Sequence, residues 1–301
     1  MLTEIRVLGP LQFTHAGSSA APTAPKPRAI LALALLHVDQ TILVRDLIQE
    51  LWGDRPPSSV LTTLQTYILS LRKLLARAFV MPAAQVAETM LLTRPGGYLL
   101  CDTSDFFDLH EYERLAALGR RSLAAGDKAA AADLLLRAQE IWQGPALADV
   151  RAGRILQPEI QELEESRLTT IEQGIEVRLS LGRHRELLSE LSGLVTRHRL
   201  HENLHGLFML ALYRSGRRQE ALGVFQRLRQ TLKAELGLEP GRRLQLLQQA
   251  ILRDDPSLES AVPAEDLVGL PPIVSWPGHM SGSVGCAGGT SGIVPGVGVA
   301  G

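Results

Sequence analysis

Beyond residue 102 the apolar residues repeat with an almost continuous helical period, and this feature constrains the fold most. Seven segments place apolar side chains every three or four residues and are separated by short breaks at glycine or proline: 105–125, 127–143, 158–181, 184–199, 202–215, 218–236 and 240–253. No strand pattern interrupts them. This part of the chain is therefore predicted to be an array of antiparallel helix pairs.

The helical array also carries an internal repeat. Gly182 and Gly216 lie 34 residues apart, and the alignment that they set pairs the apolar Leu191 with Phe225. A spacing of 34 residues is the period of tetratricopeptide repeats, in which each helix pair buries its apolar face on the next. We therefore predict an all-α, tetratricopeptide-like domain over residues 103–258.

The first hundred residues contain several short elements of different kinds. IRVLGPLQFTHAG is typical of a hairpin, and MLLTRPGGYLLCD predicts a second hairpin around its two glycines. Between them, helices are expected in PKPRAILALALLHVDQ, in TILVRDLIQELWG and from about residue 59 to 79. Three helices between a strand pair and a hairpin indicate a winged helix-turn-helix over residues 1–102. The predicted fold class is mainly α, with a small β-sheet and a wing hairpin.

The third of these helices has two contrasting faces. At about 100° per residue, one face is apolar and holds Leu61, Leu64, Tyr67, Ile68, Leu71, Leu74 and Leu75. The opposite face and its margin hold Ser59, Thr62, Gln65, Thr66, Leu69, Ser70, Arg72, Lys73 and Arg77. No acidic residue occurs from residue 55 to 87. Hydroxyl and amide groups suit base edges, and cations neutralise phosphate, so this face suits a major groove; an ordinary solvated face is the alternative.

Further candidate contacts lie outside this helix. Arg94 precedes Gly96 and Gly97 in the second hairpin, where it could reach a minor groove or a phosphate if the hairpin is a wing. Lys26 and Arg28, near the start of the first helix, are phosphate candidates, with plain surface charges as the alternative.

Bulk composition excludes several classes of protein. The 301 residues carry a net charge of −1, and residues 1–102 hold nine Lys or Arg against seven Asp or Glu, so charge alone does not indicate nucleic-acid binding. Two cysteines, Cys101 and Cys286, are too few for a disulfide scaffold and indicate a reducing compartment. The first residues lack a secretory-signal pattern, and the apolar run at residues 29–36 is too short to span a bilayer. We expect a cytoplasmic, nucleoid-associated protein without membrane contact.

The serial order of motifs resembles a known family. VLGPLQF, PKPRAILALALL, VRDLIQELWGDRPP, TLQTYILSLRKLL and LLTRPGGYLL resemble the OmpR-type winged helix of the Streptomyces antibiotic regulatory proteins. FDLHEYERLAALGRRSLAAGD, IWQGPALADV, FMLALYRSGRR and ELGLEPGRRL resemble the bacterial transcriptional activation domain that follows it in that family. The resemblance covers residues 1–258. It implies an activator that binds direct repeats near promoters of antibiotic gene clusters as two tandem protomers and recruits RNA polymerase holoenzyme through contacts that include the sigma factor. DNA contact is then expected along residues 62–77 and at Arg94.

Some features depart from the family or suggest other chemistry. Leu69 and Ser70 stand where the family usually has Ser followed by Arg or His, so an apolar contact with a thymine methyl group could replace a polar one. The motif HENLH, at His201 to His205, matches the zinc-protease pattern but opens a repeat helix. No phosphate-binding loop occurs, and we expect no enzyme, metal or cofactor. The Gly-rich stretch at 259–301 is predicted to be disordered. A helical-repeat scaffold that binds protein and no DNA remains the alternative function.

Overall fold

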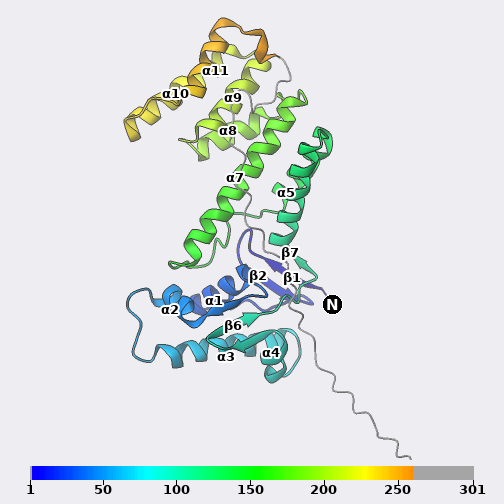
Figure 1. Cartoon of the computed structure of the whole chain (residues 1–301), viewed down its shortest axis with the longest axis vertical. Coiled ribbons are helices and arrows are strands. Elements are labelled where there is room, and N and C mark those ends of the chain that lie inside the picture. The colour runs from blue at the N-terminus through cyan, green and yellow to red at the C-terminus, as the bar shows by residue number, and fades with distance from the viewer. Residues whose placement is uncertain (1, 260–301) are drawn as a thin grey trace, which may run out of the picture.

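The computed structural model describes residues 2–259. The predicted disordered stretch from residue 259 and Cys286 lie outside the described residues, apart from residue 259 itself. Figure 1 shows two groups of elements, and the long helix α7 (Leu156–Ser180) runs from one to the other. None of the helices within residues 2–259 combines the length and the apolar composition needed to cross a bilayer.

The first group contains two small sheets and four helices. One sheet has the strand order β3-β2-β1-β7, and the other has the order β4-β6-β5. In chain order the elements are β1 (Thr3–Arg6), β2 (Gln12–His15), β3 (Ser18–Ser19), α1 (Pro25–Leu36), β4 (Thr41–Leu43), α2 (Val44–Trp52), α3 (Val60–Ala78), α4 (Ala83–Thr89), β5 (Leu91–Arg94), β6 (Gly97–Leu100) and β7 (Phe106–Phe107). The predicted order of hairpin, three helices and hairpin is present.

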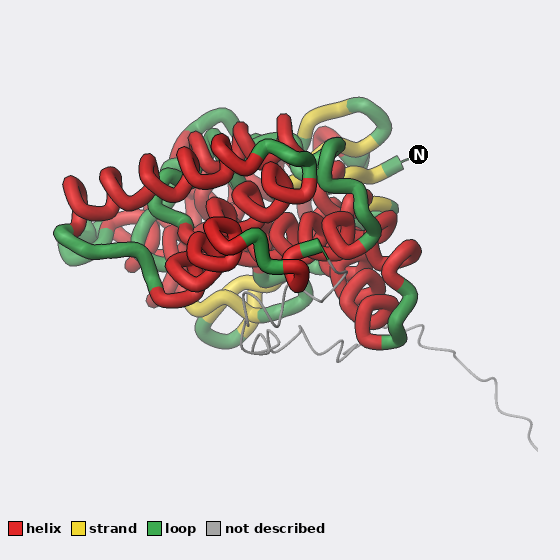
Figure 2. Tube along the Cα trace, turned by 90° about the horizontal axis from the view of Figure 1, so that it is seen from above, coloured by secondary structure: helices red, strands yellow, loops and turns green. Residues whose placement is uncertain are grey.

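The rest of the described chain is helical. It contains α5 (Asp108–Ala124), α6 (Lys128–Glu140), α7, α8 (Leu188–Arg197), α9 (Glu202–Arg214), α10 (Arg218–Leu236), α11 (Arg242–Arg253) and the 3-10 turn η1 (Pro256–Leu258). Figure 2 shows that helices dominate the molecule and that strands are confined to two places. The predicted fold class is confirmed. Gly182 and Gly216 adopt φ of 77° and 78° at the turns after α7 and α9, where a residue with a side chain would be strained.

Sequence periodicity accounts for how α1 and α3 pack. Helix α1 begins with Pro25 at its first position, is apolar on every side from residue 29 to 36, and buries nine of its twelve residues. On α3, Leu64, Ile68, Leu71 and Leu75 are buried at steps of four, three and four, as the spacing predicts. These four side chains fix one face of α3 against the core, so the opposite face is held towards solvent.

Several expectations about the elements were wrong. TILVRDLIQELWG does not form one helix, because its first three residues form β4 and pair with β6. Helix α4 and strand β7 were not predicted, and β7 lies in the segment expected to be purely helical. It pairs in parallel with β1, with Ile5 opposite Phe107. Leu61, assigned to the apolar face of α3, is 57% exposed, because the first turn of α3 extends past the core. Strands of two or three residues carry no detectable alternation, and pairing with distant strands decides their conformation.

The apolar core is not divided at residue 102, the predicted domain boundary. One continuous cluster contains Ile5, Leu33 and Leu71 of the first group together with Tyr112 of α5 and Leu156 of α7. A second cluster fills the interior of α8–α11 with the end of α7. The domain boundary at residue 102 therefore stays a prediction.

Candidate nucleic-acid interface

The exposed face of α3 holds most of the predicted contact residues. Helical geometry places five of them within about 50° of the line opposite the buried leucines: Thr62, Thr66, Leu69, Lys73 and Arg77. Gln65 and Ser70 lie beside this line, and all seven side chains are exposed. The arrangement gives α3 a ridge of hydroxyl, amide, apolar and cationic groups without a carboxylate.

The hydroxyl groups at the start of α3 also bond to the helix itself. Thr66 Oγ1 donates to the carbonyl of Thr62 at 2.9 Å, and Thr63 Oγ1 donates to the carbonyl of Ser59 at 3.0 Å. A hydroxyl whose proton is committed in this way still accepts through its lone pairs. In this rotamer Thr66 is therefore able to accept a hydrogen bond from a base amino group.

Arg72 lies at the margin of the ridge and bonds within the protein. Its Nε and Nη2 atoms donate to the carbonyl of Leu91 at 2.9 and 2.7 Å, and Nη2 also donates to Thr93 Oγ1 at 2.8 Å. Burial lowers the pKa of the Arg72 guanidinium. Arg72 thus ties α3 to strand β5 of the wing hairpin. Its predicted contact with DNA stays a prediction.

The wing hairpin is fixed at its turn by two glycines. Gly96 has a φ of 75°, and its carbonyl accepts from the backbone N–H of Val44 at 2.9 Å. A Cβ atom at Gly97 would lie 2.2 Å from the carbonyl oxygen of Ile42, so only glycine fits between β6 and β4. Arg94 is exposed at the end of β5, opposite Gly97. The predicted hairpin is present and presents Arg94 to solvent.

The two cations predicted near the start of α1 have different surroundings. Lys26 Nζ lies 4.4 Å from the ring centroid of Trp52, a cation–π contact, and the Trp52 ring stacks on Tyr67 of α3. The Arg28 guanidinium donates to the carbonyl of Leu11 at 2.7 Å, donates to that of Pro22 at 2.9 Å and pairs with Asp149. Arg28 therefore joins the first sheet to the loop after α6, and its phosphate contact stays a prediction.

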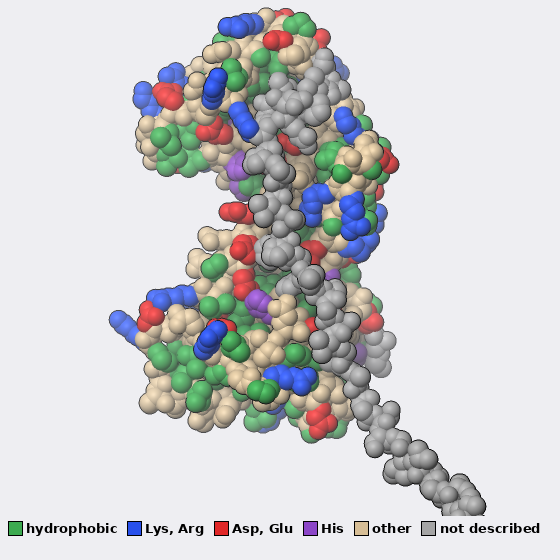
Figure 3. Space-filling view, viewed as in Figure 1, with side chains coloured by type: hydrophobic (Ala, Val, Ile, Leu, Met, Phe, Trp, Pro, Cys, Tyr) green, Lys and Arg blue, Asp and Glu red, His purple; other side chains and the backbone are tan. Residues whose placement is uncertain are grey.

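Two exposed cations of α2 and the turn after it were not assigned a role from the sequence. Arg45 lies in the first turn of α2, and Arg55 lies in the turn between α2 and α3. Arg55 is the first residue of the acid-free stretch 55–87, which was the one signal that could have included it, although Asp54 precedes it directly. Figure 3 shows acidic and basic side chains interspersed on the face in view, so that face carries no field of a single sign. Local placement on α3 and the wing therefore matters more than overall charge.

The winged-helix part is joined to the helical part through a buried carboxylate. Glu50 of α2 accepts backbone N–H groups of Gly153 at 2.5 Å, Ile155 at 2.9 Å and Leu156 at 3.0 Å, and so caps the start of α7. A Cβ atom at Gly153 would lie 2.2 Å from the Glu50 carbonyl oxygen. Negative charge is favoured at a helix N-terminus, where N–H groups lack partners within the helix. We call Glu50 and the N–H groups that it accepts the α2–α7 joint.

A second buried carboxylate holds the end of β1. Asp108, at the start of α5, accepts the N–H of Val7 at 2.9 and 3.0 Å and that of Leu8 at 2.9 Å. Burial raises the pKa of Asp108 to about 6, although the N–H donors act in the opposite direction. The carbonyls of Val7 and Leu8 accept from the N–H groups of Leu147 and Gln143 at 2.9 and 2.8 Å. The first sheet is thus bonded to both α5 and the loop after α6.

The HENLH motif does not bring its side chains together. His201 Nδ1 lies 3.2 Å from Glu172 Oε1 on α7, and burial raises the pKa of that carboxyl group. Glu202 Oε2 accepts the N–H of Gly241 at 2.6 Å ahead of α11, and His205 Nδ1 lies 3.1 Å from the carbonyl of His201. Within residues 2–259 no group of three His, Cys, Asp or Glu side chains is placed to hold a metal ion.

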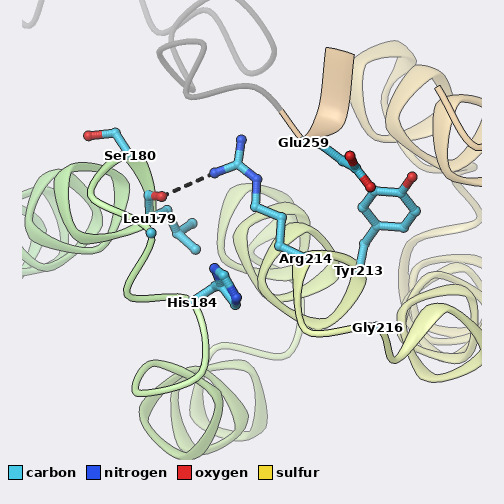
Figure 4. A pocket seen from close by; sticks show the side chains of 8 residues that line it. Leu179, Ser180, His184, Tyr213, Arg214, Gly216 and Glu259 are labelled. Atoms are coloured by element: carbon cyan, nitrogen blue, oxygen red, sulfur yellow. Dashed lines mark hydrogen bonds between the residues drawn. The ribbon is translucent and has the colours of Figure 1, made fainter. Parts of the chain in front are cut away.

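A cavity of about 370 Å³ lies at the far end of the molecule from α3, between the turns that follow α7 and α9. Figure 4 shows His184, from the turn after α7, and Arg214, the last residue of α9, lining it, with Glu259 beyond. Arg214 donates to the carbonyls of Leu179 at 3.1 Å and Leu258 at 2.8 Å, and burial lowers its pKa. Arg214 therefore ties the end of α7 to η1.

Comparisons with known proteins agree with this architecture. A family profile described as the bacterial transcriptional activator domain matches residues 107–252. The regulatory protein DnrI of Streptomyces peucetius is 46% identical over 256 residues, which cover 85% of this chain and 94% of DnrI. The chain belongs to the Streptomyces antibiotic regulatory protein family. The resemblance noted in the sequence is confirmed.

Other members and neighbours of the family extend the comparison. The regulatory protein AfsR of Streptomyces coelicolor is 40% identical over 262 residues, which cover 86% of this chain and 25% of AfsR. The structure of Mycobacterium tuberculosis EmbR in complex with a low affinity phosphopeptide is 30% identical, with a TM-score of 0.76, and the match covers 89% of this chain and 69% of that one. The predicted class, transcription regulation, is confirmed. DNA contact, direct repeats and polymerase recruitment stay predictions.

Proposed function

We propose that this family member is a sequence-specific DNA-binding activator of antibiotic or other secondary-metabolite genes. One observation carries the proposal. The exposed ridge of α3 is free of carboxylates, and the buried leucines on the opposite side hold it outward. Carboxylates on a groove-facing surface would repel phosphate, whereas a surface that binds another protein has no need to exclude them.

In this proposal α3 enters the major groove and the wing lies beside it. Thr62, Gln65, Thr66, Leu69 and Ser70 reach base edges, and the cations at Lys73 and Arg77 contact phosphate. Arg94, held out by the Gly96–Gly97 turn, contacts the minor groove or a phosphate. Arg72 fixes the position of the wing relative to α3, because its side chain bonds the wing strand β5 to this helix.

Membership of the family supports a proposal for the assembly on DNA. We infer that two protomers bind in tandem to direct repeats and help to recruit RNA polymerase holoenzyme, with contacts that include the sigma factor. The proposed activity requires no catalytic step and no cofactor. Its site of action is the nucleoid.

A footprint tests the proposal directly. The purified chain is titrated onto DNA from the chromosomal neighbourhood of its gene, and nuclease protection is measured at several salt concentrations. We expect protection of repeated short sites that weakens as salt rises. Absence of protection at low and moderate salt would contradict DNA binding and favour the helical-repeat scaffold. Transcription from the protected promoter with purified holoenzyme, with and without the chain, then tests activation.

The phosphate contacts have a test of their own. Replacing Lys73 and Arg77 with Ala should weaken binding to all sequences and reduce the slope of log affinity against log salt by about 1.8, since each phosphate contact contributes about 0.9. The matched control replaces Arg120 and Arg121, two exposed cations on α5, with Ala and should leave the slope unchanged. An unchanged slope in the α3 double variant would remove both cations from the interface.

A further inference from the structure

Leu69 is a large apolar side chain in the middle of a polar surface. It is 49% exposed, and Thr66, Ser70 and Lys73 surround it on the ridge of α3. Exposed leucines are common on proteins, and Leu246 on α11 is 52% exposed in this one. Leu69 differs in its position, because every other side chain along its ridge donates or accepts hydrogen bonds or carries positive charge.

The packing of α3 fixes the direction in which Leu69 points. Ile68 and Leu71, its near neighbours in sequence, are each 2% exposed and are held in the core. Arg72 ties the same turn of α3 to the wing strand through the carbonyl of Leu91. Rotation of α3 that would bury Leu69 would have to break both sets of contacts. The apolar side chain is therefore presented outward together with the hydrogen-bonding groups.

The chemistry of base edges limits what such a side chain is able to recognise. In the major groove, adenine, guanine and cytosine present hydrogen-bond donors and acceptors, whereas thymine also presents its 5-methyl group. A leucine placed against a donor or acceptor would remove it from water without a replacement partner. A leucine placed against a methyl group gains an apolar contact. The leucine therefore favours thymine, because a purine edge would leave a polar group unpaired and cytosine lacks the methyl group.

We propose that Leu69 is a specificity-determining residue that packs on the 5-methyl group of a thymine in each repeat of the DNA site. This inference rests on the proposed function, because it requires α3 to lie in the major groove. It goes beyond that function in assigning one base to one side chain.

The experiment is a double-mutant cycle between protein and DNA. The duplex protected in the footprint is prepared with each thymidine in turn replaced by deoxyuridine, which lacks only the 5-methyl group, and affinities are measured for the full chain and for Leu69→Ala. At one position in each repeat we expect about fourfold weaker binding to the deoxyuridine duplex, the change that loss of one buried methyl group produces. Leu69→Ala should bind the unmodified duplex more weakly by a similar factor and should show no difference between thymidine and deoxyuridine there.

Two controls separate the possible outcomes. Leu246→Ala removes an equally exposed leucine remote from α3 and should retain the fourfold preference, and the unfolding midpoint of each variant shows that it is folded. The inference would be overturned if the original chain bound its site but no deoxyuridine weakened binding. It would also be overturned if Leu69→Ala kept the same preference at the same base. If the original chain bound none of the duplexes, the proposed function itself would fail.

Discussion

The ridge of α3 and the α2–α7 joint use polar side chains in opposite ways. On the ridge, seven predicted contact residues are exposed, and all but Leu69 carry a hydrogen-bonding or charged group. At the joint, Glu50 is buried, and its carboxylate accepts three backbone N–H groups from the start of α7. The difference separates two tasks. Side chains on the ridge are exposed and available to bind a partner. The carboxylate of Glu50 already has its hydrogen-bond partners, so the α2–α7 joint holds the two parts of the chain together.

Breaking the joint should have the largest effect. Glu50→Ala removes the acceptor for the N–H groups of Gly153, Ile155 and Leu156 and leaves one buried and two half-buried N–H groups without this partner. We expect the free energy of unfolding to fall by about 3 kcal/mol, because each buried unsatisfied group costs about 1–3 kcal/mol and the loop relaxes in part. Denaturant titration measures the change.

An exposed acid on the same side of the molecule provides the control. Asp54 pairs with Arg154 close to the joint, but both side chains are largely exposed. Asp54→Ala should therefore cost about 0–1 kcal/mol. Equal losses from Glu50→Ala and Asp54→Ala would show that Glu50 does not fix the start of α7.

The two regions also differ in how far the sequence predicts them. The ridge was predicted because the pattern that defines it lies within one short stretch of sequence. Apolar residues at positions 64, 68, 71 and 75 define the buried face of a helix, and the residues on the opposite face are then exposed. The α2–α7 joint was missed because Glu50 and Gly153 are 103 residues apart, and no spacing rule connects them. Strands β4 and β7 were missed for the same reason, since each is defined by its partner strand.

Side-chain type and helical angle do not by themselves give the surroundings of a residue. Arg28 was a candidate phosphate contact, with a plain surface charge as the alternative; its guanidinium bonds within the protein to Leu11, Pro22 and Asp149, and the phosphate contact stays a prediction. Leu61 was placed with the core by its angle on the helix, although the core ends before the first turn of α3. A helical wheel gives the direction of a side chain, whereas tertiary structure decides what lies there.

Arg72 shares a feature with each region, because it lies on α3 but its side chain bonds within the protein, as that of Glu50 does. Its guanidinium holds the carbonyl of Leu91 through two nitrogens. If its role is to position the wing, Arg72→Lys should weaken DNA binding nearly as much as Arg72→Ala, about tenfold, because an ammonium keeps the charge but not the planar fork. The free energy of unfolding should fall by about 1–2 kcal/mol in both variants. Affinity measurements at two salt concentrations and denaturant titration give the two quantities.

The matched comparison is Arg77, which is exposed at the end of α3. Arg77→Lys should leave DNA affinity nearly unchanged, since a phosphate contact requires mainly charge. Recovery of full affinity in Arg72→Lys would instead assign Arg72 to a phosphate contact, and the bond to Leu91 would then be incidental.

The smallest expected effect lies at the edge of the contact between α1 and α7. His37 Nε2 lies 2.8 Å from Glu159 Oε1, and this hydrogen bond, stronger than the opposing effect of burial, raises the pKa of His37. A histidine with a raised pKa in the folded state stabilises the protein fully below its unfolded pKa of about 6.5, and this contribution is lost as pH rises through the folded pKa.

Because both side chains are partly exposed, we expect this pair to contribute about 0.5 kcal/mol or less to the free energy of unfolding. The difference in unfolding free energy between the original chain and His37→Gln should therefore be larger at pH 6 than at pH 8.5. Glu159→Gln should remove this pH dependence. A difference in unfolding free energy that instead grew with pH would contradict a raised pKa of His37 in the folded state.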